Sequence, residues 1–373
     1  MSSLFSPIQV GTRLINNRIA MAPLTRARTK QDIADERTAL YYTQRSTAGL
    51  IVSEGTPISK EGQGYLFNPG IFTSEQVEGW RTTTSSVHAV GGTIFAQLWH
   101  VGRVSHESIH GIQPVSSSSK QAIGAMAFGY QEDGTAGMIQ ASPPRALDHE
   151  EIKRVIGDFS HAAVNAIEAG FDGVEIHGAN GYLVDQFINP KINNRTDSYS
   201  GETIENRIRF AIELVDAAIA AVGSNKVAIR LSPYCEVFDM PLYEDIDQTF
   251  IALVETLGQR KLAYVHFMDH PRSALMGPQA DSTRERFDAL LKKLRLLLPE
   301  TPIVLAGGMT LERASQLVNE GTADITAFGR AYISNPDLVD RLARGWPLAV
   351  PDQSTFYGGG AEGYIDYPPY QGQ

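Results

Sequence analysis

Hydrophobic runs rich in Val, Ile and Leu recur eight times along the chain, and each is followed by a glycine or polar turn and a helix-like segment. In chain order these runs cover residues 17–25, 49–56, 92–100, 172–179, 226–233, 263–270, 302–308 and 325–330. Periodic helical patterns lie between the runs, at residues 150–170, 205–223 and 311–321 among others. Strands that alternate with helices predict a parallel sheet.

The number of these units predicts how the sheet closes. Eight of them follow one another without a domain linker, so we expect an α/β fold, a (β/α)₈ TIM barrel forming a single domain over residues 1–373. The alternative is a doubly wound open sheet with a dinucleotide site, which requires a G-x-G-x-x-G turn after the first strand. Pro23, Leu24 and Thr25 stand at that position instead, and they favour the barrel.

Two segments do not fit the repeating pattern. Residues 101–148 form a long loop rich in Ser, Gly and Pro after the third strand, on the face where such barrels keep their active sites. Loops of that length are usually functional or disordered. The tail, residues 351–373, is rich in Gly, Tyr and Pro, and we expect it to cover the barrel without regular structure.

Composition narrows the range of partners. The formal net charge is −10 and no basic stripe occurs, which argues against nucleic acid and anionic membrane surfaces. A single cysteine, Cys235, excludes an internal disulfide, a Cys-rich metal site and an iron–sulfur cluster. We find neither a signal-peptide pattern nor an apolar run long enough to span a membrane, so we expect a cytoplasmic protein.

The predicted ends of the last two strands carry a candidate phosphate site. Gly307 and Gly308 follow the seventh strand, and Gly329 and Arg330 follow the eighth. Glycines let backbone N–H groups approach phosphate oxygens, and an arginine adds a bidentate cation. Tight turns alone would also explain a Gly-Gly pair, but two neighbouring strand ends and an arginine together favour the phosphate interpretation.

Two polar side chains interrupt apolar strands that should face the same cavity. Arg230 lies within VAIRLSP, and Gln97 lies within TIFAQLW. A barrel interior accepts an arginine only when an anion or a strong acceptor pairs with it. The acceptor is either the imide-like edge of a flavin ring or the carboxylate of Glu175 on a neighbouring strand, and the pattern favours neither.

A third group of polar residues follows the fourth strand, in VEIHGANGYLVDQFINP at residues 174–190. With this segment the chain resembles the Old Yellow Enzyme family of FMN-dependent ene-reductases, from Phe5 to about Tyr357. Further segments that resemble the family, in the family's order, are NRIAMAPLTRAR, GLIVSEGTPIS, FAQLWHVGRVSH, NNRTDSYSGETIENRIRF, AGGM and FGRAYISNPDLV. Together they are far more specific than any one alone.

The resemblance implies a non-covalent FMN at the carboxyl end of the barrel, with NADPH or NADH as the reductant. It places Pro23, Leu24 and Thr25 along the flavin, with the Thr25 hydroxyl bonding the C4 carbonyl oxygen. It also places Gln97 at the pyrimidine edge and Arg230 near N1 and O2, where a cation stabilises the charge of the reduced ring. The other implied FMN contacts are Gly55, Gly307, Gly308, Gly329 and Arg330.

His177 and Asn180 look like the family's donor pair, which holds a carbonyl or nitro oxygen of an activated alkene. Each good donor of this kind is worth roughly 3–4 kcal/mol of transition-state stabilisation. Tyr182 resembles the family's proton donor to the α-carbon, since a phenol with a pKa of about 10 stays protonated at neutral pH. Trp99, Phe356 and Tyr357 look like walls of the same pocket.

The chain departs from the family pattern at a few positions. Asn180 stands where many members have a second histidine, which conserves the donor but can shift substrate preference. Ser200 replaces a usual glycine, and Thr25 rather than a cysteine is typical of the classical subgroup.

Two other functions stay open from the sequence: a flavoprotein that binds or senses phenols with little turnover, and a flavin-free phosphate-binding lyase or isomerase. The predicted partners are an activated alkene and a nicotinamide cofactor, with no metal, in a monomer or homodimer. No role is predicted for His100, His266 and His270.

Overall fold

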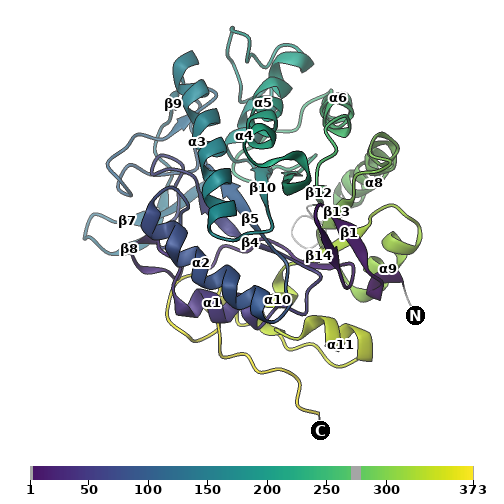
Figure 1. Ribbon diagram of the computed structural model, residues 1–373. Helices are drawn as coiled ribbons and strands as arrows, with labels where there is room; N and C mark the ends of the chain where they lie inside the picture. Colours follow the sequence, from purple (N-terminus) through teal and green to yellow (C-terminus); the bar gives the residue numbers. More distant parts are fainter. Residues whose placement is uncertain (1–2, 270–278, 373) are drawn as a thin grey trace.

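Eight parallel strands close into a barrel in the computed structural model, which describes residues 3–269 and 279–372 (Figure 1). Around the barrel the order is β10-β11-β12-β13-β14-β3-β4-β5, so the chain's own strand order is kept and the sheet closes on itself. The strands are β3 (Ile19–Met21), β4 (Leu50–Pro57), β5 (Ile94–Trp99), β10 (Gly173–Gly178), β11 (Val227–Leu231), β12 (Tyr264–Met268), β13 (Ile303–Ala306) and β14 (Ile325–Phe328). Each predicted run coincides with one strand, with β4 ending one residue beyond its run, which confirms the barrel; His270, at the end of one run, lies outside the described residues.

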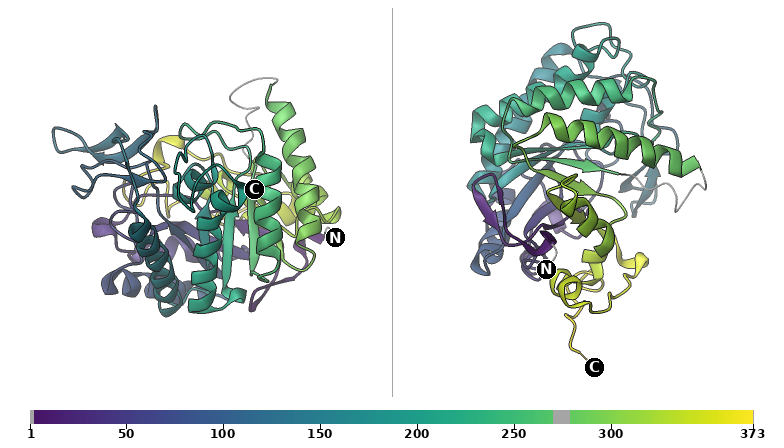
Figure 2. Two further views of the ribbon diagram at one scale, coloured as in Figure 1. Left: turned by 90° about the horizontal axis from the view of Figure 1, so that it is seen from above. Right: turned by 90° about the vertical axis from the view of Figure 1, so that its right-hand side faces the viewer.

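Helices surround the barrel and run alongside its strands (Figure 2, left). The longer ones are α2 (Ser74–Ala89), α3 (His149–Glu168), α5 (Ile204–Val222), α6 (Ile246–Gly258), α8 (Gln279–Leu297) and α9 (Leu311–Asn319). The shorter ones are α1 (Glu36–Thr43), α4 (Leu183–Ile188), α10 (Arg330–Ser334) and α11 (Leu338–Arg344). Their starts have local causes: Asp148 caps α3, Thr203 caps α5 and Thr310 caps α9, each by accepting a backbone N–H. Among the described helices, none is long and apolar enough to cross a membrane.

Two hydrophobic layers hold the barrel. The larger one lies between strands and helices, and the smaller one fills the barrel interior, where Phe95 and Tyr264 meet with ring centroids 5.4 Å apart. An N-terminal hairpin, β1 (Ile8–Val10) and β2 (Arg13–Ile15), packs its buried residues into the same inner layer. The amino end of the barrel is therefore closed by side chains, and only the carboxyl end is available for a site.

The long segment after β5 is more ordered than its composition indicated. It contains the antiparallel hairpin β7 (Met126–Tyr130) and β8 (Ala136–Gln140), and the short parallel pair β6 (Val115–Ser116) and β9 (Arg145–Ala146). The hairpin strands carry glycines and an exposed face, so they lack the hydrophobic run that marks the barrel strands. The hairpin stands beyond the carboxyl ends of the strands (Figure 2, left).

The C-terminal tail lies against the barrel, as predicted. It has one short 3₁₀ turn, η4 (Gln353–Thr355), and is otherwise irregular. Tyr364 stacks on Tyr41 of α1 with ring centroids 4.3 Å apart, and Arg26, at the end of the first barrel loop, donates hydrogen bonds to three tail carbonyls. These contacts bring the tail's aromatic residues to the edge of the barrel mouth.

Candidate active site

A cavity of about 580 Å³ opens at the carboxyl end of the barrel. Its lining includes seven of the residues predicted from the sequence: Pro23, Leu24, Thr25, Tyr182, Arg330, Phe356 and Tyr357. Its other walls come from the hairpin and from loops after β4 and β11: Tyr65, Met126, Phe128, Met138 and Phe238. The cavity is mostly apolar, which suits a flat aromatic ligand.

The loop after β10 carries the predicted donor residues. His177 is buried near the end of the strand, and Tyr182 stands immediately before α4 with its ring centroid 5.1 Å from that of His177. Between them the chain makes an unusual turn, because Asn180 and Gly181 both have positive φ, +60° and +75°. The turn brings the two side chains, five residues apart, into contact at the carboxyl end of the barrel, where Tyr182 lines the cavity and His177 lies beside it.

Burial sets the protonation of both groups. The pKa of His177 is well below its usual value because the ring is buried and because Arg230 and His266 lie nearby, so the imidazole is neutral at neutral pH. The pKa of Tyr182 is well above its usual value because of burial and the neighbouring Tyr65. His177 can therefore donate a hydrogen bond without a charge, and Tyr182 keeps its proton.

Trp99, at the end of β5, forms the wall behind these residues. Its ring centroid lies 4.9 Å from that of Tyr182 and 6.1 Å from that of His177. Gly55 leaves room for the indole, since a Cβ at this position would come within 2.4 Å of it. The absence of a side chain at Gly55 is thus explained by the packing of Trp99, and a contact with FMN stays a prediction.

Tyr65 is a cavity residue that sequence reasoning missed. Its hydroxyl lies 3.4 Å from that of Tyr182, and its ring stacks on Trp99 at 5.5 Å. The only signal in the sequence was its place in a loop after a strand end, where barrels build their sites. Phe238 and the hairpin residues had no comparable signal in the sequence. They belong to segments distant from one another in the chain, and only the folded structure places them together at the cavity.

The two polar strand residues, Gln97 and Arg230, differ in their contacts with Glu175. Glu175 accepts a hydrogen bond from Gln97 Nε2 at 2.8 Å with one oxygen, and its other oxygen lies 2.8 Å from His266 Nδ1. Arg230 contacts Met268 Sδ at 3.3 Å, and its buried Nε has no hydrogen-bond partner. Among the described residues, Arg230 forms no ion pair with Glu175, so the guanidinium is open to an acceptor supplied by a ligand.

The glycines after β13 and β14 lie side by side, because these strands are neighbours in the barrel. Gly307 and Gly308 have φ of +120° and +52°, and a Cβ on Gly307 would come within 1.9 Å of the Asp269 carbonyl oxygen. Gly329 precedes α10, and Arg330 lines the cavity. Tight packing accounts for Gly307, while the joint position of all four residues is compatible with the predicted phosphate contact.

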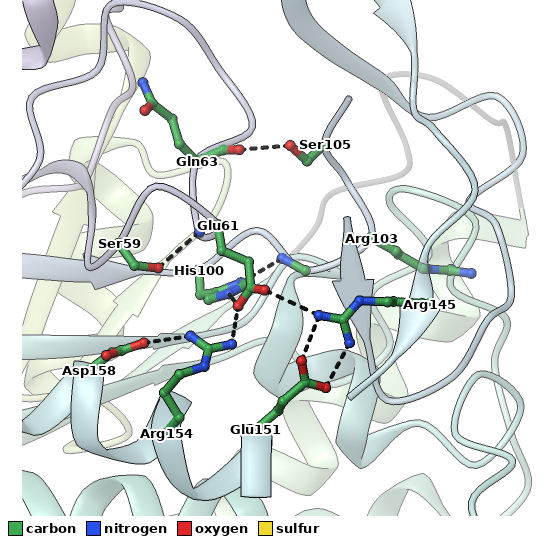
Figure 3. Close-up of polar contacts among 12 residues, drawn as sticks. Ser59, Glu61, Gln63, His100, Arg103, Ser105, Arg145, Glu151, Arg154 and Asp158 are labelled. Carbon is green, nitrogen blue, oxygen red and sulfur yellow. Dashed lines mark hydrogen bonds and ion pairs between the residues drawn. The ribbon is translucent and has the colours of Figure 1, made fainter. Parts of the chain in front are cut away.

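A charge network supports the loop after β4, which leads to Tyr65 (Figure 3). Glu61 ion-pairs with Arg154 of α3 at 2.5 Å and with Arg145 at 3.7 Å, and it lies 3.8 Å from the buried His100 ring. Burial alone would raise the pKa of Glu61, but His100 and Arg154 bring it down to about 2. The network was not predicted, since its members are far apart in the sequence.

The residues present fit an FMN. The apolar cavity can receive the ring, the orphaned Arg230 Nε can meet an electron-rich edge, and Arg330 can meet an anionic end.

Comparison with known proteins gives consistent matches. The model of the NADH:flavin oxidoreductase / NADH oxidase family matches residues 3–349. The chain is 40% identical over 374 residues to 12-oxophytodienoate reductase 1 of Oryza sativa subsp. japonica, covering 98% of this chain and 92% of that protein. It is 38% identical over 369 residues to 12-oxophytodienoate reductase 2 of Arabidopsis thaliana, covering 98% and 95%.

Solved structures show the same likeness. Morphinone reductase in complex with tetrahydroNAD superposes with a TM-score of 0.92 at 42% identity, covering 100% of this chain and 98% of that one. The Old Yellow Enzyme homologue from Zymomonas mobilis superposes with a TM-score of 0.90 at 40% identity, covering 99% and 100%.

Proposed function

Because the chain belongs to the NADH:flavin oxidoreductase / NADH oxidase family, as an Old Yellow Enzyme member, it is an FMN-dependent, NADH-linked ene-reductase, and we propose how its residues divide that work. His177 and Asn180 hold the activating oxygen of an α,β-unsaturated carbonyl or nitro compound, and Tyr182 donates the proton. The observation that carries this assignment is the contact, beside the cavity, between a neutral imidazole and a protonated phenol whose ring centroids lie 5.1 Å apart.

An FMN held in this cavity would supply the hydride-transfer chemistry between the reduced nicotinamide and the alkene. We propose that Pro23, Leu24 and Thr25 line the flavin ring and that Arg230 neutralises charge at its pyrimidine edge. Gln97, which donates a hydrogen bond to Glu175, would contact the same edge. The strand-end set Gly307, Gly308, Gly329 and Arg330 would hold the phosphate, and Gly55 would make a further backbone contact with the cofactor.

The roles of the protein residues in the reaction follow from the protonation states of His177 and Tyr182. Hydrogen bonds from His177 and Asn180 to the substrate oxygen withdraw electron density from the C=C bond and stabilise the negative charge that develops, by roughly 3–4 kcal/mol per donor. Tyr182 then releases its proton to the α-carbon. Trp99, Phe356 and Tyr357 exclude water and limit the orientations that a substrate can take.

A specific observation weighs against a flavin-free lyase or isomerase. Such an enzyme needs a strand-end base, and Glu175 was the obvious inward carboxylate. Both of its oxygens are engaged, with Gln97 and with His266. The phenol-binding flavoprotein is distinguished from the reductase only by turnover.

We further propose that the chain acts as one FMN-binding domain in the cytoplasm, as a monomer or a homodimer. NADPH and NADH are both candidate reductants. The experiment below also measures which of the two the protein prefers.

The test is an anaerobic absorbance spectrum of the purified protein, followed by NADH or NADPH and then 2-cyclohexenone. We expect flavin bands that bleach with the nicotinamide and return with the enone. Bleaching without reoxidation by enones or nitroalkenes would contradict the proposed substrate class. A protein that FMN cannot reconstitute would contradict the cofactor site.

A further inference from the structure

The turn between His177 and Tyr182 holds two consecutive residues in the left-handed region. For Gly181 this conformation carries no steric penalty, but for Asn180 it costs on the order of 1 kcal/mol. A side chain at position 181 is excluded as well, because a Cβ there would come within 2.6 Å of the Val237 carbonyl oxygen. Contacts elsewhere must therefore hold the turn in this shape.

Two buried side chains supply those contacts. The Asn180 N–H donates to Ser232 Oγ at 2.7 Å, and the Gly181 N–H donates to Asp185 Oδ2 at 2.9 Å. The Ser232 hydroxyl also lies 3.5 Å from the same Asp185 oxygen, so the two side chains that hold the turn contact each other. Ser232 follows β11 and Asp185 lies in the first turn of α4, so the turn is tied to the neighbouring strand and to its own helix.

The start of α4 is fixed from a third side. The Leu183 N–H donates to the His100 carbonyl at 3.2 Å, which ties the residue after Tyr182 to the end of β5. Ser232 and Asp185 are 2% and 6% exposed, so water competes little for these bonds. The turn has little freedom to rotate while both side chains are present.

We propose that Ser232 and Asp185 are positioning residues that hold the Asn180–Gly181 turn and thereby aim the Asn180 amide and the Tyr182 phenol at the substrate. This inference rests on the proposed roles of Asn180 and Tyr182. Neither Ser232 nor Asp185 needs to touch the substrate, because each acts through a backbone N–H. A shift of about 1 Å in a reacting group can cost about 100-fold in rate.

The main variant is Ser232→Ala, with Ser232→Thr as the conservative variant that keeps the hydroxyl. A matched control is Ser118→Ala, because Ser118 is also a buried serine that accepts a backbone N–H, from Lys120 at 3.3 Å, and donates to a carbonyl, of Ile192 at 2.7 Å. We expect Ser232→Ala to lower kcat/KM for 2-cyclohexenone about 10- to 100-fold and to weaken 4-chlorophenol binding about 10-fold. Ser232→Thr and Ser118→Ala should stay within about 3-fold of the parent, and all should keep their FMN.

A second measurement does not depend on turnover. Amide hydrogen exchange in a peptide covering residues 178–184 should become at least about 10-fold faster in Ser232→Ala, because the Asn180 N–H loses its acceptor. It should stay unchanged in Ser118→Ala. If Ser232→Ala does not yield folded holoenzyme, Asp185→Ala takes its place, with faster exchange and a lower kcat/KM, because the Gly181 N–H loses its acceptor.

Parent-like exchange and kinetics in Ser232→Ala, or equal losses in Ser118→Ala, would overturn the positioning role. If the parent protein itself does not reduce enones or bind the phenol, the proposed function fails, while the exchange comparison still decides whether Ser232 holds the turn.

Discussion

Two loops that meet at the cavity through Tyr65 and Tyr182 are each held by one carboxylate, and the pKa values of the two carboxylates are shifted in opposite directions. Glu61 holds the loop that leads to Tyr65, and its pKa is lowered to about 2 by His100 and Arg154 against the effect of burial. Asp185 holds the turn before Tyr182, and burial raises its pKa to about 7 despite hydrogen bonds from Gly181 and Ser232.

The difference follows from what surrounds each group. The arginines around Glu61 are about two-fifths exposed, so salt and acid can reach that network. Asp185 is bonded to a neutral N–H and a hydroxyl within the protein, and the charge that acts on it is that of Arg103. The loop with the proposed proton donor is thus held by contacts that salt screens little, whereas the loop that leads to Tyr65 is held by ion pairs.

The largest expected effect separates the tyrosines of the two loops. Tyr182→Phe should slow enone reduction by roughly 100-fold or more while leaving flavin reduction by the nicotinamide intact, because only the proton donor is lost. Tyr65→Phe should cost less than about 10-fold. Stopped-flow absorbance of the two half-reactions measures both, and equal impairment of the two half-reactions in Tyr182→Phe would remove that residue from the donor role.

A second prediction concerns the donors on the turn. The double variant His177→Ala with Asn180→Ala should weaken 4-chlorophenol binding by roughly 100-fold, since two hydrogen bonds to the ligand oxygen are lost. The flavin spectrum and FMN content should not change. Release of FMN from the double variant would instead mean that the pair retains the cofactor.

Removing the charge of Glu61 should destabilise the fold without abolishing the chemistry. We expect Glu61→Gln to lower the free energy of unfolding by roughly 1–3 kcal/mol, because charge-assisted bonds to Arg154 and Arg145 are lost. The control Glu78→Gln breaks an exposed pair with Arg81 and should cost less than about 1 kcal/mol. Denaturant unfolding of the three proteins decides this, and equal losses would show that the network adds no special stability.

The pH dependence of stability should have opposite signs at the two carboxylates. Glu61 has a folded pKa of about 2 against 4.5 for the free group, so its contribution is present above pH 4.5 and lost as pH falls toward 2. Asp185 has a folded pKa of about 7 against 3.8, so the folded state binds the extra proton and stability falls as pH rises from 3.8 toward 7.

Differences in the free energy of unfolding between the parent and the variants Glu61→Gln and Asp185→Asn isolate these two contributions in unfolding experiments from pH 2 to 8. Arg103 and Tyr243 face Asp185 and are present in both proteins of that comparison. A parent-minus-Asp185→Asn difference that does not fall across this range would contradict the raised pKa.

The smallest expected effect is that of salt. Raising ionic strength from about 0.1 to 1 M should reduce the stability difference between the parent and Glu61→Gln by less than about 1 kcal/mol. The same change should leave the difference between the parent and Ser232→Ala unaltered, because that contact involves a hydroxyl and a backbone N–H. An equal salt response at both sites would remove the distinction between the loops.

Most of the architecture was predictable because its signals are local. Each barrel strand is a short apolar run followed by a turn, and helices such as α3 and α5 begin at a capping side chain that can be read from a few residues. The candidate residues His177, Asn180 and Tyr182 could be named for a similar reason, since they share one segment whose order the resemblance matched.

Only the tertiary structure decided which side chains contact one another when they are distant in the chain. Glu175 was an equal candidate partner for Arg230 until Gln97 and His266 were seen to occupy its oxygens. Tyr65 meets Tyr182 across 117 positions, and Ser232 meets Asn180 across 52. Hydrophobic periodicity reports which face of an element is buried but not which partner it meets, so hydrogen bonds between strand-end loops appear only once the barrel has closed.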